Sequence, residues 1–344
     1  MLAHVHTSVT RSSMAIRTID LFCGGGGSSW GAQAGGAEIV AGVDAWHLAC
    51  ETFQHNFPNA DAVNATLDGT SSRDVIGDVG NIDLLLASPE CTNHTCAKGN
   101  RPRDEDSKRT ALFVLNFARS YQPRWIVLEN VVHMRSWHGY SELLSELEKN
   151  YNINPQVIDA SELGVPQKRR RLFIVCDREE EVPDIAPIID SAQLTVKDIL
   201  EPTGVFKAKP LFSEKRAEAT LERARRGMKA LGEGTPFLVV YYGSDGSGGW
   251  QPLDRPLRTM TTLDRFGLVE WNDWEPTLRM LQVPELKRAM GFDDGYDLAH
   301  GTRRDKIKLL GNGVCPPVME AIVSQLTEAE SDLDASQTVP AAAE

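Results

Sequence analysis

The sequence predicts an α/β fold: a doubly wound, mostly parallel sheet with a second, smaller domain. Strand-like apolar segments alternate with helix-like segments from residue 16 to residue 177. A glycine run stands between the first strand and the first helix. After residue 177 the composition shifts to an acidic, proline-containing stretch, "REEEVPDIAPIID", which is a plausible domain boundary. In open sheets of this kind, ligands lie beyond the carboxyl ends of the strands.

The elements of the first domain follow from the pattern of apolar residues. Short aliphatic runs that end at a polar or turn residue predict strands, and longer amphipathic runs predict helices. We expect strands at 17–22, 37–44, 82–88, 125–130, 151–159 and 170–177. We expect helices from about residue 28 and at 45–57, 108–122 and 141–150.

The rest of the chain predicts the second domain and a return to the first. A charged helix at 212–231, an apolar strand at 236–243 and the loop "GSDGSGGW" form the second domain, and a final helix at 316–330 packs back on the first. We expect a flexible extension over 1–15, a large domain over 16–178 completed by 298–328, a second domain over 179–297 and a disordered tail over 329–344.

Composition excludes several classes of protein. No apolar run approaches the roughly 20 residues of a membrane span, and the first 15 residues lack the apolar core of a signal peptide. The six scattered cysteines favour reduced thiols in a cytosol over a disulfide scaffold. The net charge of −12 argues against sequence-independent nucleic-acid binding. Basic clusters at 168–171, 215–229 and 303–308 are either solvated surfaces or phosphate contacts.

One loop concentrates reactive side chains. Residues 87–97, "ASPECTNHTCA", follow an apolar strand and contain Cys91, His94 and Cys96. A zinc site is one reading, but the paired C-x-x-C spacing of structural zinc sites is missing. A redox pair and a buried, inert cysteine are two others. The polar residues around Cys91 favour a functional loop at the end of a strand.

Three further motifs lie at strand ends. The turn "DLFCGGGG" with Asp44 about 20 residues on favours an adenosine-containing cofactor, either a dinucleotide or S-adenosylmethionine. Glu129 and Asn130 end another strand, where they serve either to recognise a ring nitrogen and an exocyclic amine or to cap a helix. Arg169 and Arg171 alternate on a strand and could bind phosphates or hold a loop.

The order of the motifs is more specific than any one of them. D-L-F-C-G-G-G, P-x-C, E-N-V, Q-x-R-x-R, R-P-x-x-T-x-T-T and G-N-x-V follow one another along the chain. In this order they resemble the DNA (cytosine-5) methyltransferase family, over about residues 17–323 with a poorly matched stretch at 180–250. The resemblance implies a Rossmann-like, class I S-adenosylmethionine-dependent fold and makes the second domain a target-recognition domain.

The resemblance also implies a reaction. S-adenosylmethionine donates a methyl group to carbon 5 of a flipped-out cytosine in a specific short DNA sequence, and S-adenosylhomocysteine is the product. By this resemblance Cys91 attacks carbon 6 as the nucleophile, and Glu129 binds N3 and the exocyclic amine. Arg171 contacts the cytosine carbonyl, Arg169 is its partner arginine and Asn130 shapes the pocket.

The binding residues follow from the same motifs. The cofactor-binding residues implied by the resemblance are Phe22, Gly24, Gly26, Asp44, Trp46, Thr66, Ser88, Asn312 and Val314. The implied DNA-binding residues are Lys98, Arg101, Arg103, Gln167, Tyr242 and Thr261, with Tyr241 a further candidate and Gln167 also expected to organise the end of the sheet. No metal is expected.

The chain departs from the family pattern at two positions. Glu90 stands where the family usually has proline immediately before the catalytic cysteine. A carboxylate beside a thiolate raises the thiol pKa, so we expect the Glu90 side chain to point away or to pair with a cation. Thr66 stands where the family usually has an acidic residue that contacts the adenine amine.

Other functions remain open from the sequence alone. The same fold could methylate cytosine in RNA or use a modified methyl donor, and a relative without activity could simply bind DNA. The presence of Cys91, Glu129 and Arg171 disfavours the last of these. We expect double-stranded DNA as the partner, a monomer, no membrane, and the cytoplasm of a bacterial or phage-infected cell. A restriction partner cannot be read from the sequence.

Overall fold

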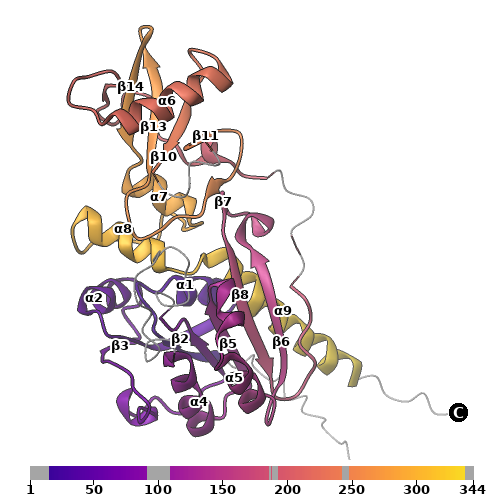
Figure 1. Cartoon of the computed structure of the whole chain (residues 1–344). Helices are drawn as coiled ribbons and strands as arrows, with labels where there is room; N and C mark the ends of the chain where they lie inside the picture. Colours follow the sequence, from indigo (N-terminus) through magenta and orange to yellow (C-terminus); the bar gives the residue numbers. More distant parts are fainter. Residues whose placement is uncertain (1–14, 91–108, 186, 188–192, 242–247, 338–344) are drawn as a thin grey trace, which may run out of the picture.

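The computed structural model describes residues 15–90, 109–185, 187, 193–241 and 248–337 of the 344-residue chain. Two sheets lie one above the other in Figure 1, with helices α7 and α8 between them. The lower, larger sheet has seven strands in the order β3-β2-β1-β4-β5-β8-β6. These strands are β1 Ile16–Leu21, β2 Ala37–Asp44, β3 Asp61–Asn64, β4 Leu84–Ala87, β5 Trp125–Asn130, β6 Asn152–Asp159 and β8 Arg170–Asp177.

Strand direction brings distant parts of the chain to one edge of the large sheet. Strands β1 to β5 pair in parallel, so their carboxyl ends meet at the same edge. Strand β8 runs antiparallel to β5, with Asn130 opposite Leu172 and Trp125 opposite Asp177. Because of this reversal, the start of β8 lies beside the end of β5, which places Arg171 next to Glu129.

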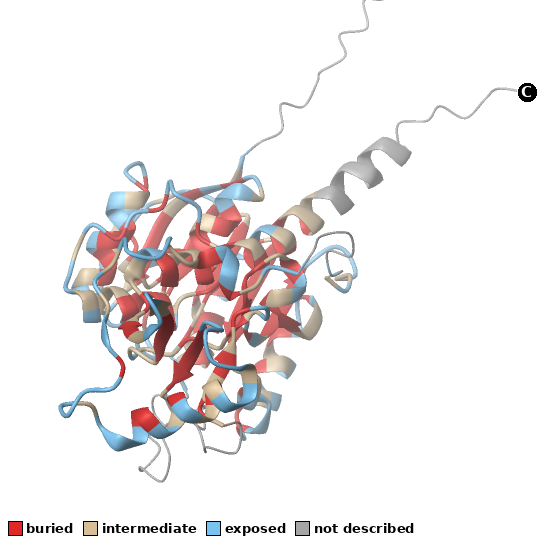
Figure 2. Cartoon of the chain, turned by 90° about the horizontal axis from the view of Figure 1, so that it is seen from above, coloured by how far each residue is buried: buried red, intermediate tan, exposed pale blue. Residues whose placement is uncertain are grey.

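The large sheet is covered on both faces. Along β4, Leu84 and Leu86 join one apolar core while Leu85 and Ala87 join the other, as alternation along a strand requires. The first core is completed by α1, α2 and α9, and the second by α4 and α5. Figure 2 shows the buried residues gathered on the strands. These helices are α1 Gly27–Ala34, α2 His47–Asn56, α4 Thr110–Tyr121, α5 Tyr140–Leu147 and α9 Pro316–Gln337.

The smaller sheet is antiparallel and has five strands, in the order β11-β10-β13-β14-β9. Phe237 and Val239 of β10 pack under α6, while Leu238 and Val240 face the core that is shared with the large sheet. The two units are therefore joined by continuous apolar packing. The elements are β9 Lys209–Pro210, α6 Glu218–Leu231, β10 Phe237–Val240, β11 Trp250–Pro252, β13 Phe266–Asn272 and β14 Glu275–Met280.

Short elements connect the two units. Strand β7 Gln167–Lys168 pairs in parallel with β12 Leu257–Arg258. Helices α7 Val283–Ala289 and α8 Arg303–Asn312 lead the chain back from the smaller sheet. Within the described residues, no helix combines the length and the apolar character of a membrane span.

The predicted fold class is confirmed, and two predicted boundaries are wrong. Helix α6 begins at Glu218 instead of residue 212, because Arg216 turns back to bind the carbonyls of Pro210 and Leu211. Helix α9 continues to Gln337, where we predicted a tail from residue 329, because alanine and glutamate favour helix. The other domain boundaries stay predictions, although Asn152 and Asn154 still bind carbonyls within 180–183.

Candidate functional site

The glycine-rich turn leaves β1 in a strained conformation. Phe22 has a φ of 58°, in the left-handed region that non-glycine residues rarely adopt. Gly26, with a φ of 88°, caps α1. A side chain at Gly27 would put its Cβ 2.5 Å from the carbonyl oxygen of Val314. The first and last motifs of the sequence are therefore in direct contact, and strain of this kind clusters at ligand sites.

Asp44 ties two loops together. Its Oδ2 accepts a hydrogen bond from the Gly24 amide at 2.9 Å, and its Oδ1 accepts one from the Trp46 amide at 2.8 Å. Burial raises the pKa of Asp44, while these two amides and the charge of Lys308 lower it. The carboxylate thus fixes the glycine turn and the start of α2 at one end of the sheet.

Asp20 is a buried carboxylate that the motif analysis did not single out. It lies in β1 with no exposed surface, and its Oδ2 accepts hydrogen bonds from Ser28 Oγ at 2.5 Å and Ser29 Oγ at 2.7 Å. Its Oδ1 has no partner among the described residues. Burial raises the pKa of Asp20 to about 6. The clue in the sequence was an acidic residue inside an apolar strand, eight positions before paired serines.

The position of Ser88 indicates a ligand site at this end of the sheet. Its amide donates to the Leu21 carbonyl at 3.0 Å, which places it beside the glycine turn. Its buried hydroxyl has no hydrogen-bond partner in the described part of the chain. Buried polar groups are normally paired, so an orphan hydroxyl beside Phe22 fits a polar ligand such as a nucleoside cofactor.

Glu129 and Arg171 form a buried ion pair at the end of β5. Arg171 Nε lies 3.1 Å from Glu129 Oε1, and the Glu129 side chain is 9% exposed. Burial raises the pKa of Glu129, while Arg171 and, more weakly, Arg169 lower it. The pair joins two of the predicted catalytic residues, and it keeps a titratable carboxyl in a place largely shielded from water.

Asn130 links the ends of two strands of the large sheet. Its Nδ2 donates to the Pro89 carbonyl at 3.2 Å, and its Oδ1 accepts from the Val131 amide at 2.9 Å. Asn130 is fully buried, so this link holds the end of β4 against the end of β5. Cys91, two residues beyond Pro89, lies outside the described residues.

Arg169 fastens three segments together. Its guanidinium donates to the carbonyls of Met260 at 3.1 Å, Gly311 at 2.9 Å and Gly313 at 3.0 Å. The side chain is buried, and its own amide donates to Asp159. Arg169 therefore holds the fifth and sixth motifs against the sheet, whereas its neighbour Arg171 faces Glu129.

Gln167 corrects one prediction. It has no exposed surface, its Nε2 donates to the Ala289 carbonyl and its Oε1 accepts from the Met260 amide. A DNA contact is ruled out in this conformation because both ends of the amide are occupied inside the protein. Gln167 does organise the end of the sheet, as expected. Thr261 is half-buried, and its backbone packs closely on Gly311.

The other predicted site residues differ in how far they are exposed, and several lie outside the described residues. Asn312, Thr66 and Glu90 are exposed, and Trp46 is half-buried. Tyr241 lies near α6, with Arg223 Cζ 5.9 Å from its ring centre. The predicted residues Lys98, Arg101, Arg103 and Tyr242 lie outside the described residues, as do Cys91, His94 and Cys96, so the zinc and redox alternatives stay untested.

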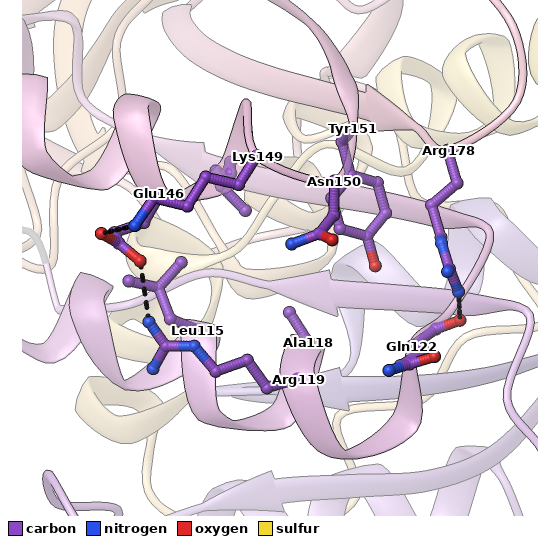
Figure 3. A pocket seen from close by; sticks show the side chains of 10 residues that line it. Leu115, Ala118, Arg119, Gln122, Glu146, Lys149, Asn150, Tyr151 and Arg178 are labelled. Carbon is purple, nitrogen blue, oxygen red and sulfur yellow. Dashed lines mark hydrogen bonds and ion pairs between the residues drawn. The ribbon is translucent and has the colours of Figure 1, made fainter.

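A separate cavity of about 320 Å³ lies at the opposite end of the sheet (Figure 3). It lies between α4 and α5, before the start of β5. In Figure 3 its charges are paired: Glu146 with Arg119 and Lys149, and Arg178 with the Gln122 carbonyl. No predicted site residue lines it. The candidate site is therefore the carboxyl edge of the strands.

Comparisons with known proteins agree with this assignment. The family described as C-5 cytosine-specific DNA methylase matches residues 16–328. The Type II methyltransferase M.HgiDI of Herpetosiphon aurantiacus is 32% identical over 257 residues, which cover 71% of this chain and 80% of that protein. M.HhaI of Haemophilus parahaemolyticus is 28% identical over 329 residues, covering 89% and 93%.

Solved structures show the same fold. The S. pombe Dnmt2 methyltransferase superposes with a TM-score of 0.66 at 17% identity, covering 92% of this chain and 99% of that one. A Spodoptera frugiperda DNMT2 mutant gives 0.65 at 18%, covering 91% and 99%. The family match spans nearly the whole described chain. This chain therefore belongs to the C-5 cytosine-specific DNA methylase family, whose members transfer a methyl group from S-adenosylmethionine to carbon 5 of cytosine in DNA.

Proposed function

We propose that this methyltransferase acts on a flipped-out cytosine within a short sequence of double-stranded DNA, through a covalent bond between Cys91 and carbon 6. The observation that carries the proposal is the buried Glu129–Arg171 pair beside the strand end that leads to Cys91. Carbon 6 is unreachable inside a stacked duplex, so the base has to leave the helix.

The first step is attack by the Cys91 thiolate. Carbon 5 of cytosine is a poor nucleophile, and a new sulfur–carbon bond at carbon 6 moves electron density onto carbon 5. Asn130 supports this step by holding Pro89, and with it the backbone that leads to Cys91. Asn130 is a positioning residue in this proposal, since its side chain is occupied by backbone groups.

Glu129 binds the ring as its charge changes. A carboxyl whose pKa is raised by burial can hold a proton at N3 and accept a hydrogen bond from the exocyclic amine. Protonation at N3 withdraws electrons from the ring and favours attack at carbon 6. The Arg171 guanidinium donates to the cytosine carbonyl and keeps Glu129 in place, while Arg169 holds the backbone of the last motif at Gly311.

The second step forms the methyl–carbon bond and releases the enzyme. Bound S-adenosylmethionine supplies an electrophilic methyl group on a sulfonium sulfur. As carbon 5 takes the methyl group, the sulfur–methyl bond would break and S-adenosylhomocysteine would leave. A base, which we take to be a water molecule, then removes the proton from carbon 5, and its electron pair re-forms the double bond between carbons 5 and 6 as the Cys91 thiolate leaves carbon 6. Asp44 would bind the ribose hydroxyls and Phe22 and Trp46 would flank the adenine, while the orphan Ser88 hydroxyl lies next to the glycine turn.

The smaller sheet reads the DNA sequence. Antiparallel pairing of β10 with β13 places Val240 opposite Phe266, at the end of the smaller sheet where β14 leads into α7. We assign the connection after β10, which contains Tyr242, to groove contacts. Thr261 and the basic residues Lys98, Arg101 and Arg103 are proposed phosphate contacts.

The test is covalent trapping. A duplex with 5-fluorocytosine at the target position, plus S-adenosylmethionine, should give an adduct that survives denaturant, because fluorine cannot leave as the proton does. Cys91→Ala should give none, while the control Cys176→Ala, a buried cysteine on β8, should trap normally. Equal trapping by Cys91→Ala would overturn the proposed mechanism.

RNA is the competing substrate. The same experiment with a fluorinated RNA of matched sequence decides between the two, and we expect DNA to be trapped at least about tenfold faster. We further infer a monomer in the cytoplasm of a bacterial or phage-infected cell. Equilibrium sedimentation at micromolar concentration checks the monomer.

A further inference from the structure

Helix α8 carries a lysine that reaches the cofactor end of the large sheet. The Nζ of Lys308 lies 4.1 Å from the centre of the Trp46 ring. Trp46 caps the start of α2, and its amide donates to Asp44 at 2.8 Å. The positive charge of the same lysine lowers the pKa of Asp44. Three segments far apart in sequence thus meet at one point.

We propose that Lys308 is a positioning residue for the cofactor, holding the Trp46 ring beside Asp44 through this cation–π contact. The inference rests on the proposed roles of Asp44 and Trp46 in cofactor binding. An ammonium group over an indole face is attracted by the ring quadrupole, and indole is the strongest of the aromatic partners. An ordered ring avoids the entropy loss of fixing a mobile tryptophan when the cofactor binds.

The backbone that carries Lys308 is itself held at both ends. At its start, Arg303 Nη2 binds Asp264 Oδ2 at 2.6 Å and the Leu281 carbonyl at 2.7 Å. At its end, Arg169 binds the Gly311 carbonyl. Although the Lys308 side chain is exposed, its stem therefore starts from a fixed helix, so the contact with Trp46 has a defined geometry.

The positive charge of Lys308 should also favour cofactor binding, through its effect on Asp44. Burial raises the pKa of Asp44, and the positive charge of Lys308 opposes that rise. An ionised carboxylate accepts hydrogen bonds from ribose hydroxyls more strongly than a protonated one. Removal of Lys308 should therefore leave the Trp46 ring less well ordered and make Asp44 a weaker hydrogen-bond acceptor for the ribose.

The experiment measures S-adenosylhomocysteine binding to the full chain without DNA, by isothermal titration calorimetry. Lys308→Met, which keeps the length of the stem, should weaken binding about fivefold. Lys308→Arg keeps the cation and should bind within about twofold of the unchanged protein. Lys306→Met, a loss of the same charge two residues earlier on α8, should leave the affinity unchanged.

Kinetics provide a readout that a structural defect would not reproduce. With Lys308→Met, KM for S-adenosylmethionine should rise by the same factor while kcat at saturation stays constant. Unchanged affinity in Lys308→Met, failure of Lys308→Arg to restore it, or equal weakening by Lys306→Met would overturn the inference.

Variants of Asp44 and Trp46 separate the proposed cofactor site from the proposed role of Lys308. Asp44→Asn and Trp46→Leu test the cofactor site itself and should weaken binding far more than Lys308→Met does. If these two variants bind normally, the assigned cofactor site is wrong. If they weaken binding and Lys308→Met does not, only the role of Lys308 fails.

Discussion

Two buried carboxylates in different parts of the molecule contrast sharply. At the junction below the smaller sheet, Glu285 has no exposed surface and accepts two hydrogen bonds from Arg279, at 2.7 and 2.8 Å. The amides of Glu201 and Gln282 fill its remaining positions. At the end of the large sheet, Arg171 supplies the one ion pair of Glu129 within the described residues.

The contrast separates a structural carboxylate from a functional one. A fully hydrogen-bonded pair such as Glu285–Arg279 repays its desolvation inside the protein and has no capacity left for a ligand. Glu129 is also buried, though less completely than Glu285, and it keeps acceptor capacity; its pKa is raised by burial. Burial alone does not mark a catalytic group, whereas burial with unfilled hydrogen-bonding capacity does.

The strongest test of the contrast removes the structural carboxylate. Glu285→Gln should lower the free energy of unfolding by about 3–5 kcal/mol, because the Arg279 charge loses its bidentate partner while buried. Urea unfolding followed by circular dichroism measures it. Glu218→Gln, which breaks the exposed pair with Arg225, is the control and should change stability by less than about 1 kcal/mol. Equal effects of the two variants would contradict the assignment.

The second test removes the functional carboxylate. Glu129→Gln should reduce kcat by about 10²–10³-fold, because neither the proton at N3 nor the charge on the ring is stabilised. Its effect on the free energy of unfolding should be smaller than that of Glu285→Gln, because the Arg171 side chain is 16% exposed and loses one ion pair, whereas Arg279 is 2% exposed and loses two hydrogen bonds. Single-turnover methylation and urea unfolding measure the two quantities. A large loss of stability with normal turnover would show that Glu129 is a structural carboxylate and not a catalytic one.

Asp20 lies between these two cases, because its Oδ2 accepts two hydrogen bonds and its Oδ1 has none within the described residues. We expect the smallest of the three effects for this residue. Its folded-state pKa of about 6 lies above the ordinary value of 3.8, so the folded state holds the proton more tightly than the unfolded chain does. The contribution of Asp20 to stability is therefore complete below about pH 4 and falls by about 2–3 kcal/mol as pH rises to about 6.

The Asp20→Asn variant isolates this pH dependence. Asparagine does not titrate, so the difference in free energy of unfolding between the unchanged protein and the variant should shrink by that amount between pH 4 and pH 7. Urea unfolding at half-unit pH steps measures the two curves. Parallel curves would show that Asp20 titrates alike in the folded and unfolded states.

Much of the site could be predicted because it follows the strands. Asp44, Ser88 and Glu129 stand at or just after the ends of parallel strands, and such ends meet at one edge in any doubly wound sheet. The resemblance implied a DNA contact for Gln167, but a sequence pattern does not show that a side chain is enclosed in the protein. Lys308 and Glu285 carried no signal, since their partners lie on other segments.

The sequence by itself determined the fold class, the family and the set of candidate residues, because apolar periodicity and ordered motifs are local properties of the chain. Tertiary structure alone decided which carboxylate is saturated, that β8 runs antiparallel and so brings Arg171 to Glu129, and that Lys308 meets Trp46. The physical reason is that hydrogen bonding, burial and cation–π contact depend on distances between segments, and these exist only once the two sheets have packed.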